Sequence, residues 1–146
     1  MADIHATTST TLRCIVVTPE ATAVDTPCEF VAVPLADGEA GIAPGRAALI
    51  GRLGYGELRV RHGGQTSRYY VDGGFVQVAD NLVSVLTNKA VEAANLNAGA
   101  AQEQLVQARS AHAAGEAEMA ARDRHIAQAR GQLRVAGHTG AARTGH

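Results

Sequence analysis

Several kinds of residue are scarce in this chain of 146 residues, and each scarcity narrows what the protein can be. Aromatic residues make up 3% of the chain and tryptophan is absent, so the core must be built from Val, Leu, Ile and Ala. The two cysteines, Cys14 and Cys28, are too few for a disulfide scaffold or a four-cysteine metal site. Both lie in apolar stretches, which favours two reduced thiols on strands; a disulfide between them is the alternative.

An excess of charge of one sign and long apolar runs are also lacking. The chain has 13 basic and 14 acidic residues and a net charge of -1, which gives no electrostatic reason to expect a nucleic acid or an anionic membrane surface as partner. No apolar run approaches the ~20 residues of a membrane-spanning helix, so no direct membrane insertion is expected. Met1–Thr10 lacks the basic and apolar regions of a secretory signal and is interpreted as a flexible tail.

The first two thirds of the chain is rich instead in glycine and in short β-type runs. Asp37–Val60 alone contains six glycines and a proline. Each glycine destabilises a helix interior by ~1 kcal/mol relative to alanine, whereas tight turns use the positive φ angles that glycine adopts freely. Turn residues recur from Leu12 to Asn88, and Gly63-Gly64 between two β-type runs predicts a hairpin. We therefore predict an antiparallel β-sandwich of about ten short strands.

The rest of the chain has the composition of helices, because Lys89–Val135 is rich in alanine and contains no proline. Asn97 is a suitable N-cap for a first helix over about Ala98–Ala113. A second helix is expected over about Glu116–Val135, with Gly137 as its stop, and the short link makes the pair an antiparallel hairpin. The predicted domains are a flexible tail at 1–10, a sandwich at 11–90, a helical hairpin at 91–136 and a flexible tail at 137–146.

The two predicted helices offer each other a narrow seam made mostly of alanine. Its residues are Met119, Ile126, Ala129 and Leu133 on the second helix and Ala101, Leu105 and Ala108 on the first. A buried alanine contributes far less than the ~1.5–3 kcal/mol of a buried Leu or Ile, and Gly131 weakens the second helix further. The hairpin is therefore expected to pack weakly, either as a marginal appendage or as an element that detaches and moves.

The polar residues form no recognisable catalytic or metal-binding set. The six histidines show no metal-ligand spacing. Gly51–Glu57 superficially resembles a phosphate loop, but it lacks the Gly-Lys-Ser/Thr ending and opens no helix, so a β-turn is favoured. Asp37 and Glu39 are close in sequence, but nothing near them indicates burial, so solvated turn residues are favoured. We predict no catalytic residues, no metal, no cofactor and no enzymatic activity of the chain by itself.

Six short stretches, in order, carry a more specific signal. The longest is Asp37–Gly45, DGEAGIAPG, which fits the pattern D-G-E-x-G-I-x-P-G. The others are Val16–Glu20 (VVTPE), Gly56–Val60 (GELRV), Gly73–Val78 (GGFVQV), Val85–Thr87 followed by Ala90, and Gln132–Val135 (QLRV). Together they resemble the epsilon subunit family of F-type ATP synthases, called delta in mitochondria. The resemblance runs from about Leu12 to Ala136 and implies a β-sandwich followed by a helical hairpin.

Two departures from the pattern of this family concern nucleotide binding. Some bacterial members bind ATP through an I/L-D-x-x-R-A motif, in which Asn97 here replaces the acid and Ala100 replaces the arginine. Alignment of the second helix on Leu133 also places Gln128 and Gln132 where the nucleotide-binding arginines would fall. The resemblance therefore implies that regulatory ATP binding is weak or absent.

The resemblance implies a non-catalytic rotor subunit of the central stalk, which couples ion-driven rotation to ATP synthesis. The sandwich would contact the gamma subunit and the polar loops of the membrane c-ring, with Glu39, Ile42 and Arg46 as candidate ring contacts. The hairpin would lie on the sandwich or extend toward the alpha and beta subunits as a brake on ATP hydrolysis. The candidate residues for the extended contact are Arg122, Arg124, Arg130 and Arg134, whose alternative role is to complement the helix dipole.

The same resemblance implies a peripheral location at the cytoplasmic face of the bacterial plasma membrane. Two other functions compete with the rotor subunit. One is a free-standing sandwich-and-hairpin interaction module outside any rotary ATPase. The other is a small hydrolase or nucleotide-binding enzyme, which the lack of a nucleophile–base pair disfavours.

Overall fold

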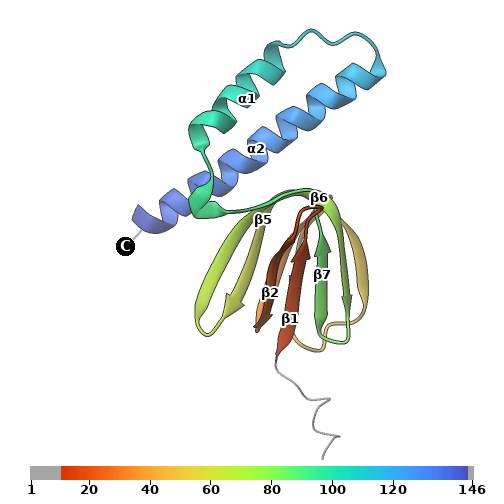
Figure 1. Cartoon of the computed structure of the whole chain (residues 1–146), viewed down its shortest axis with the longest axis vertical. Helices are drawn as coiled ribbons and strands as arrows, with labels where there is room; N and C mark the ends of the chain where they lie inside the picture. The colour runs from red at the N-terminus through yellow and green to blue at the C-terminus, as the bar shows by residue number, and fades with distance from the viewer. Residues whose placement is uncertain (1–10, 145–146) are drawn as a thin grey trace, which may run out of the picture.

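The computed structural model describes residues 11–144, and the side chains of residues 11–137, as a strand-rich part followed by a helical part (Figure 1). The strands are β1 (Leu12–Val17), β2 (Thr22–Cys28), β3 (Phe30–Leu35), β4 (Gly38–Ile42), β5 (Leu49–His62), β6 (Gln65–Ala79), β7 (Leu82–Leu86) and β8 (Ala90–Glu92). The helices are the short η2 (Ala93–Asn95), α1 (Ala98–Ser110) and α2 (Glu116–Thr144). The tail predicted at 1–10, and the last two residues of the tail predicted at 137–146, lie outside the described residues.

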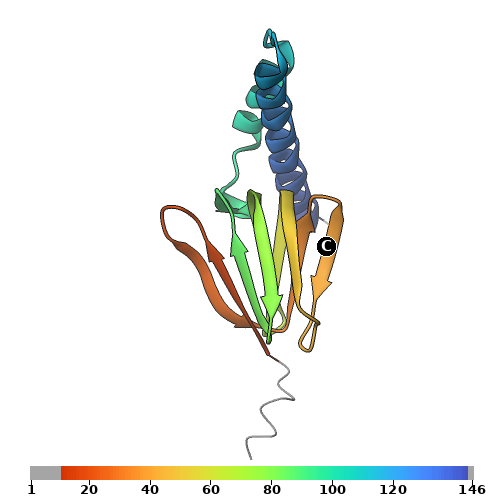
Figure 2. The same ribbon diagram turned by 90° about the vertical axis from the view of Figure 1, so that its right-hand side faces the viewer.

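The strands form one eight-stranded sheet that folds over on itself into a sandwich (Figure 2). The strand order is β2-β1-β7-β6-β5-β3-β4, with β8 paired to β6. The predicted sandwich is confirmed, but it is not purely antiparallel, because β1 and β7 run parallel. A parallel pair needs a long connection, and here all of β2 to β6 lies between the two strands in the chain. Local residue patterns carry no information about pairing over such a separation.

About ten short strands were predicted, but the structure has fewer and longer ones. The reason is that two strands continue through glycines that were predicted to form turns. β5 has 14 residues and β6 has 15. The two strands pair along most of their length, and the predicted Gly63-Gly64 turn connects them as a hairpin. Within β6, Gly73 and Gly74 have φ angles of +72° and +110°. A Cβ at Gly74 would overlap the carbonyl oxygen of Leu86. These glycines therefore let a long strand bend instead of ending it.

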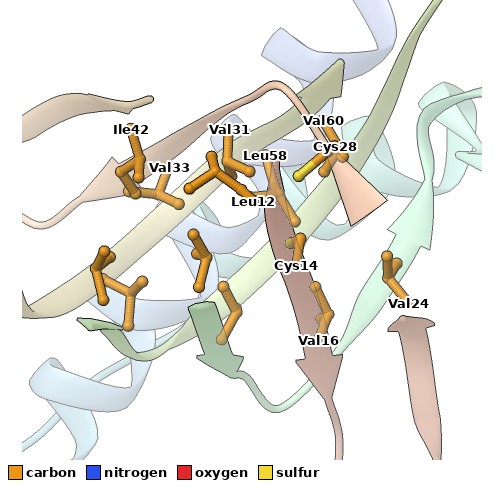
Figure 3. Close-up of a cluster of buried hydrophobic side chains, with 14 of the residues drawn as sticks. Leu12, Cys14, Val16, Val24, Cys28, Val31, Val33, Ile42, Leu58 and Val60 are labelled. Carbon is orange, nitrogen blue, oxygen red and sulfur yellow. The ribbon is translucent and has the colours of Figure 1, made fainter. Parts of the chain in front are cut away.

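The core between the two layers is aliphatic, as the scarcity of aromatic residues predicted. Fully buried side chains from both layers meet there, including Leu12, Val33 and Leu58 (Figure 3). Cys14 and Cys28 belong to the same cluster and are free thiols with no exposed surface. Each buried Val or Leu stabilises the fold by ~1.5–3 kcal/mol, so many medium-sized side chains replace a few aromatic ones.

The helical part begins as predicted and ends later than predicted. Asn97 caps α1, since its Oδ1 accepts a hydrogen bond of 2.9 Å from the backbone N–H of Ala100. α1 ends at Ser110, and α2 continues past Gly137 to Thr144. The predicted stop at Gly137 is therefore wrong, because a single glycine costs a helix only ~1 kcal/mol. The sandwich also continues to β8, beyond the predicted boundary at residue 90.

The alanine seam between the helices is present in part. The predicted residues of α1, Ala101, Leu105 and Ala108, are all buried. On α2, Ala129 is fully buried, but Met119 is 46% exposed and so does not belong to the seam. Within the described residues, neither helix combines the length and apolarity needed to cross a membrane.

Candidate functional site

Five large apolar side chains of the described strands are exposed, and we call four of them, all except Leu82, the apolar face. Val17, Ile50, Phe75 and Leu86 are 38%, 75%, 57% and 56% exposed. They belong to β1, β5, β6 and β7, which are neighbours in the sheet, and the pairing places Leu86 beside both Phe75 and Val17. Exposed apolar residues grouped on one face are typical of sites that bind a protein, a membrane or a ligand.

The apolar face arises from adjacent apolar residues in the strands. In each of the pairs Val16-Val17, Phe75-Val76 and Val85-Leu86, one side chain is fully buried and the other is exposed. This follows because successive side chains of a strand point to opposite faces of the sheet. The apolar face was not among the features predicted from the sequence. Such adjacent pairs, in strands with only one face toward the core, were the signal that could have found it.

An open hollow of 620 Å³ adjoins the apolar face. Three of the stretches that carry the family resemblance meet around it and contribute Thr18 and Pro19, Gly73 to Phe75, and Leu86 and Thr87. Arg52 is the one charged side chain among its lining residues. A mostly apolar hollow with a single cation is suited to receive apolar side chains of a partner, and its lining residues include no acid, histidine, lysine or cysteine.

Two of the predicted ring contacts differ from expectation, because Glu39 is exposed but paired within the chain and Ile42 is buried. Glu39 was predicted to be a solvated turn residue, but it lies on strand β4, which a short loop follows. The Glu39 carboxylate on β4 accepts hydrogen bonds of 3.0 and 3.2 Å from the Arg59 guanidinium. Ile42 is fully buried in the core, so a ring contact through its side chain is excluded in this conformation.

The third predicted ring contact, Arg46, is exposed in the loop after β4. The backbone N–H of Gly45 donates a hydrogen bond of 2.8 Å to the Asn81 side chain in the turn between β6 and β7. This bond fixes the loop at the end of the sandwich away from the helices (Figure 1). Of the three predicted ring contacts, Arg46 is the one that is exposed at this end of the sandwich.

At the opposite end, Asp72 connects the sandwich to α2. Its carboxylate accepts hydrogen bonds from the Tyr70 hydroxyl at 2.7 Å and from the Gln128 side chain at 3.2 Å. Burial, reinforced by the hydrogen bond to Asp72, raises the pKa of the Tyr70 hydroxyl, so it stays protonated and keeps donating. Gln128 and Gln132, which the alignment placed at nucleotide-binding positions, both interact with this pair. In the folded hairpin they thus serve internal contacts.

The four arginines predicted for the extended hairpin do not form one basic strip. Arg134 donates a hydrogen bond of 3.2 Å to the Tyr55 carbonyl oxygen, and Arg130 lines a crevice between α2 and the sandwich. Arg122 is partly buried, whereas Arg124 is exposed. At 3.6 residues per turn these positions spread around the helix, so only Arg130 and Arg134 lie together on the side that faces the sandwich.

Comparison with known proteins identifies the family. Residues 11–93 match the family model of the ATP synthase delta/epsilon chain β-sandwich domain. The chain belongs to the ATP synthase delta/epsilon chain family. It is 44% identical over 124 residues to the ATP synthase epsilon chain of Rhodopirellula baltica, an alignment that covers 85% of this chain and 97% of the relative. It is 40% identical over 101 residues to an epsilon chain of a Synechococcus strain, covering 69% and 73%.

Two solved structures share the fold at low sequence identity. A chain of the mitochondrial ATP synthase of Euglena gracilis superimposes with a TM-score of 0.78 at 21% identity, covering 88% of this chain and 82% of that one. A chain of the Tetrahymena thermophila central stalk and c-ring structure gives 0.69 at 14% identity, covering 86% and 96%. Family membership confirms the predicted resemblance. It also confirms the prediction that the chain is a non-catalytic subunit of ATP synthase.

Proposed function

We propose that the chain works as a rotor subunit that couples ion-driven rotation to ATP synthesis, with the apolar face bound to the gamma subunit. The observation that carries the proposal is the exposed row of Val17, Phe75 and Leu86 beside a hollow lined by the family's own motif residues. Burying side chains of this size stabilises a complex by removing apolar surface from water. Arg52 at the rim adds a position where an acidic partner residue is favourable.

The gamma contact is tested by size-exclusion chromatography of the full chain mixed with the gamma subunit of its own host. A stoichiometric complex is expected at micromolar concentration, and Leu86→Glu should abolish it. Val106→Glu is the matched control, because Val106 is an equally exposed apolar residue, at 55%, on α1. Elution of the unmodified chain alone would contradict the proposal, and so would equal effects of the two substitutions.

The hairpin has two positions in this proposal, folded on the sandwich or extended toward the alpha and beta subunits as a brake on ATP hydrolysis. The narrow alanine seam supports this, because elements that move are drawn from the weakly packed parts of a fold. Arg130 and Arg134 face the sandwich in the folded position and would face acidic surface in the extended one. Deletion of residues 98–146 leaves β8 intact and should raise ATP hydrolysis by the reconstituted soluble complex. Unchanged hydrolysis would mean that the hairpin is not a brake.

The end of the sandwich that bears Arg46 would face the polar loops of the c-ring, in a peripheral position at the cytoplasmic face of the bacterial plasma membrane. Its exposed position at the end away from the helices supports this orientation. Arg46→Glu should reduce co-purification of the chain with the assembled rotor. Arg109→Glu serves as the control, since Arg109 is also exposed but lies on α1, away from this end of the sandwich.

A further inference from the structure

α2 meets the sandwich at a residue that has no side chain. The helix crosses β5 at Tyr55, in the middle of the strand, and lies over one end of the sandwich (Figure 1). A Cβ placed on Gly131 would lie 2.6 Å from the carbonyl oxygen of Tyr55 and 3.0 Å from its carbonyl carbon. Cβ atoms do not approach backbone so closely, so any larger residue would push the helix away from the strand. Gly131 was expected only to weaken the helix, and in the structure it also permits this close contact.

Two side chains on either side of Gly131 fasten the helix to the same corner of the sandwich. Gln128 donates a hydrogen bond of 3.2 Å to Asp72, and Arg134 donates one of 3.2 Å to the Tyr55 carbonyl oxygen. Residues three apart lie on one face of a helix, so all three positions face the strands together. We call Gln128, Gly131 and Arg134 the latch.

The surface that receives the latch is fixed independently of it. Asp72 accepts the 2.7 Å hydrogen bond of the Tyr70 hydroxyl, and its backbone N–H donates to the Thr87 hydroxyl at 3.0 Å. These bonds remain when Gln128 leaves, so the receiving site is preorganised. Around it, Val135 of α2 is 2% exposed and belongs to the same apolar cluster as the fully buried Tyr70.

α1 takes little part in holding the hairpin down. It packs mainly on α2, and the Gln104 side chain donates a hydrogen bond of 3.4 Å to the His125 carbonyl oxygen of α2. In Figure 1, α1 lies beside α2 and away from the strands. Whatever holds α2 on the sandwich therefore also holds α1.

We propose that the latch decides whether the hairpin is docked, with Gly131 setting the fit and α1 carried by α2. This rests on the proposed function in which the hairpin has two positions. The latch is suited to release, because it contains no buried ion pair and no large apolar anchor. On release, Gln128 becomes solvated, and Arg134 becomes available with Arg130 to an acidic partner surface.

The test compares Gly131→Leu with Gly137→Leu in the full chain. Both changes raise helix propensity equally, but a Cβ at Gly137 has no atom within 4 Å. Gly131→Leu should speed amide hydrogen exchange of residues 128–135 by about tenfold or more and enlarge the maximum dimension in X-ray scattering. Gly137→Leu should do neither. If the amides of β1 and β7 exchange at the rates of the unmodified chain, the sandwich is still folded. Gly131→Ala is a milder substitution for use if Gly131→Leu unfolds the sandwich.

If Gly131→Leu had the same amide exchange rates and the same maximum dimension as the unmodified chain, the proposed latch would be wrong. Equal release of the hairpin by Gly137→Leu would overturn it as well, because the effect would then belong to the helix and not to the contact. Docking is measured on the chain alone, so it is independent of the brake. Release of the hairpin by Gly131→Leu without a change in ATP hydrolysis of the reconstituted complex would support the latch and count against the brake.

Discussion

Arg59 and Glu39 form a doubly hydrogen-bonded ion pair, of 3.0 and 3.2 Å, on the outer surface of the sandwich. The pair links β5 to β4 across β3, so it joins two strands that are not neighbours in the sheet. Their side chains are 29% and 50% exposed, and an ion pair in such surroundings stabilises a fold by at most ~1 kcal/mol. Glu39, which was predicted from the sequence to contact the ring, thus already has a partner within the chain.

Glu39→Lys is expected to weaken assembly of the rotor while leaving the isolated chain folded. The free energy of unfolding should change by less than about 1 kcal/mol, as measured by urea titration, whereas co-purification with the gamma subunit and ring should drop. The control is the charge swap Glu39→Lys with Arg59→Glu, made together with Glu57→Gln because Glu57 also accepts a hydrogen bond of 3.2 Å from Arg59; it rebuilds the ion pair with reversed polarity. Recovery of assembly in the swap would show that Glu39 acts only through Arg59, against a ring contact.

Gly74→Ala is expected to be far more destabilising than Gly64→Ala. Both glycines have positive φ angles, of +110° and +81°. A Cβ at Gly64 meets nothing, whereas one at Gly74 overlaps the Leu86 carbonyl oxygen. Gly64→Ala should therefore cost about 1–2 kcal/mol for its left-handed backbone, and Gly74→Ala at least about 3 kcal/mol, because β6 and β7 must separate. Equal losses in urea unfolding would be inconsistent with the strand bend described above.

Stability is expected to fall in alkaline solution because of a buried thiol. Burial, with smaller contributions from Cys28 and Asp25, raises the pKa of the Cys14 thiol from 9.0 to about 12. Between these values the unfolded chain loses the thiol proton and the folded chain keeps it, so rising pH favours unfolding. The contribution is fully present below about pH 9 and is lost toward about pH 12. Urea unfolding at about pH 10.5 should show a loss of roughly 2 kcal/mol relative to about pH 8.

Cys14→Val is the control for this pH dependence, because it keeps an apolar side chain of similar size in the core. Burial also raises the pKa of Cys28 and of the Tyr70 hydroxyl. The variant should therefore lose less stability than the unmodified chain between about pH 9 and about pH 12, without becoming independent of pH. The same loss in both proteins would mean that Cys14 is not the responsible group.

Calorimetric titration of the full chain with ATP is expected to show no binding of millimolar affinity or tighter. Asn97 and Ala100 lack the charges of the family's nucleotide motif, and the Gln128 side chain is bonded to Asp72. The double variant Asn97→Asp with Ala100→Arg restores the two motif charges. Its ATP titration is the reference against which any weak heat from the unmodified chain is compared. A clear isotherm from the unmodified chain would overturn the expectation.

Gly131 shows where inference from local sequence ended. Its cost to helix propensity could be predicted, because that cost depends only on the residue and its helical neighbours. Its contact with the Tyr55 carbonyl oxygen could not, because the two residues are far apart in the chain. Ile42 shows the same limit, since a signature motif locates it but only the packing of β4 against the core reveals that it is buried.

The sequence by itself determined the sandwich followed by a hairpin, the Gly63-Gly64 turn, the Asn97 cap, the aliphatic core and the family. These follow from periodicity, turn chemistry and motifs, which are properties of neighbouring residues. Only the tertiary structure decided the parallel pairing of β1 with β7, the apolar face, the Glu39–Arg59 pair and the latch. Each of these depends on which distant segments lie side by side, a choice made by the packing of the whole sheet and helix.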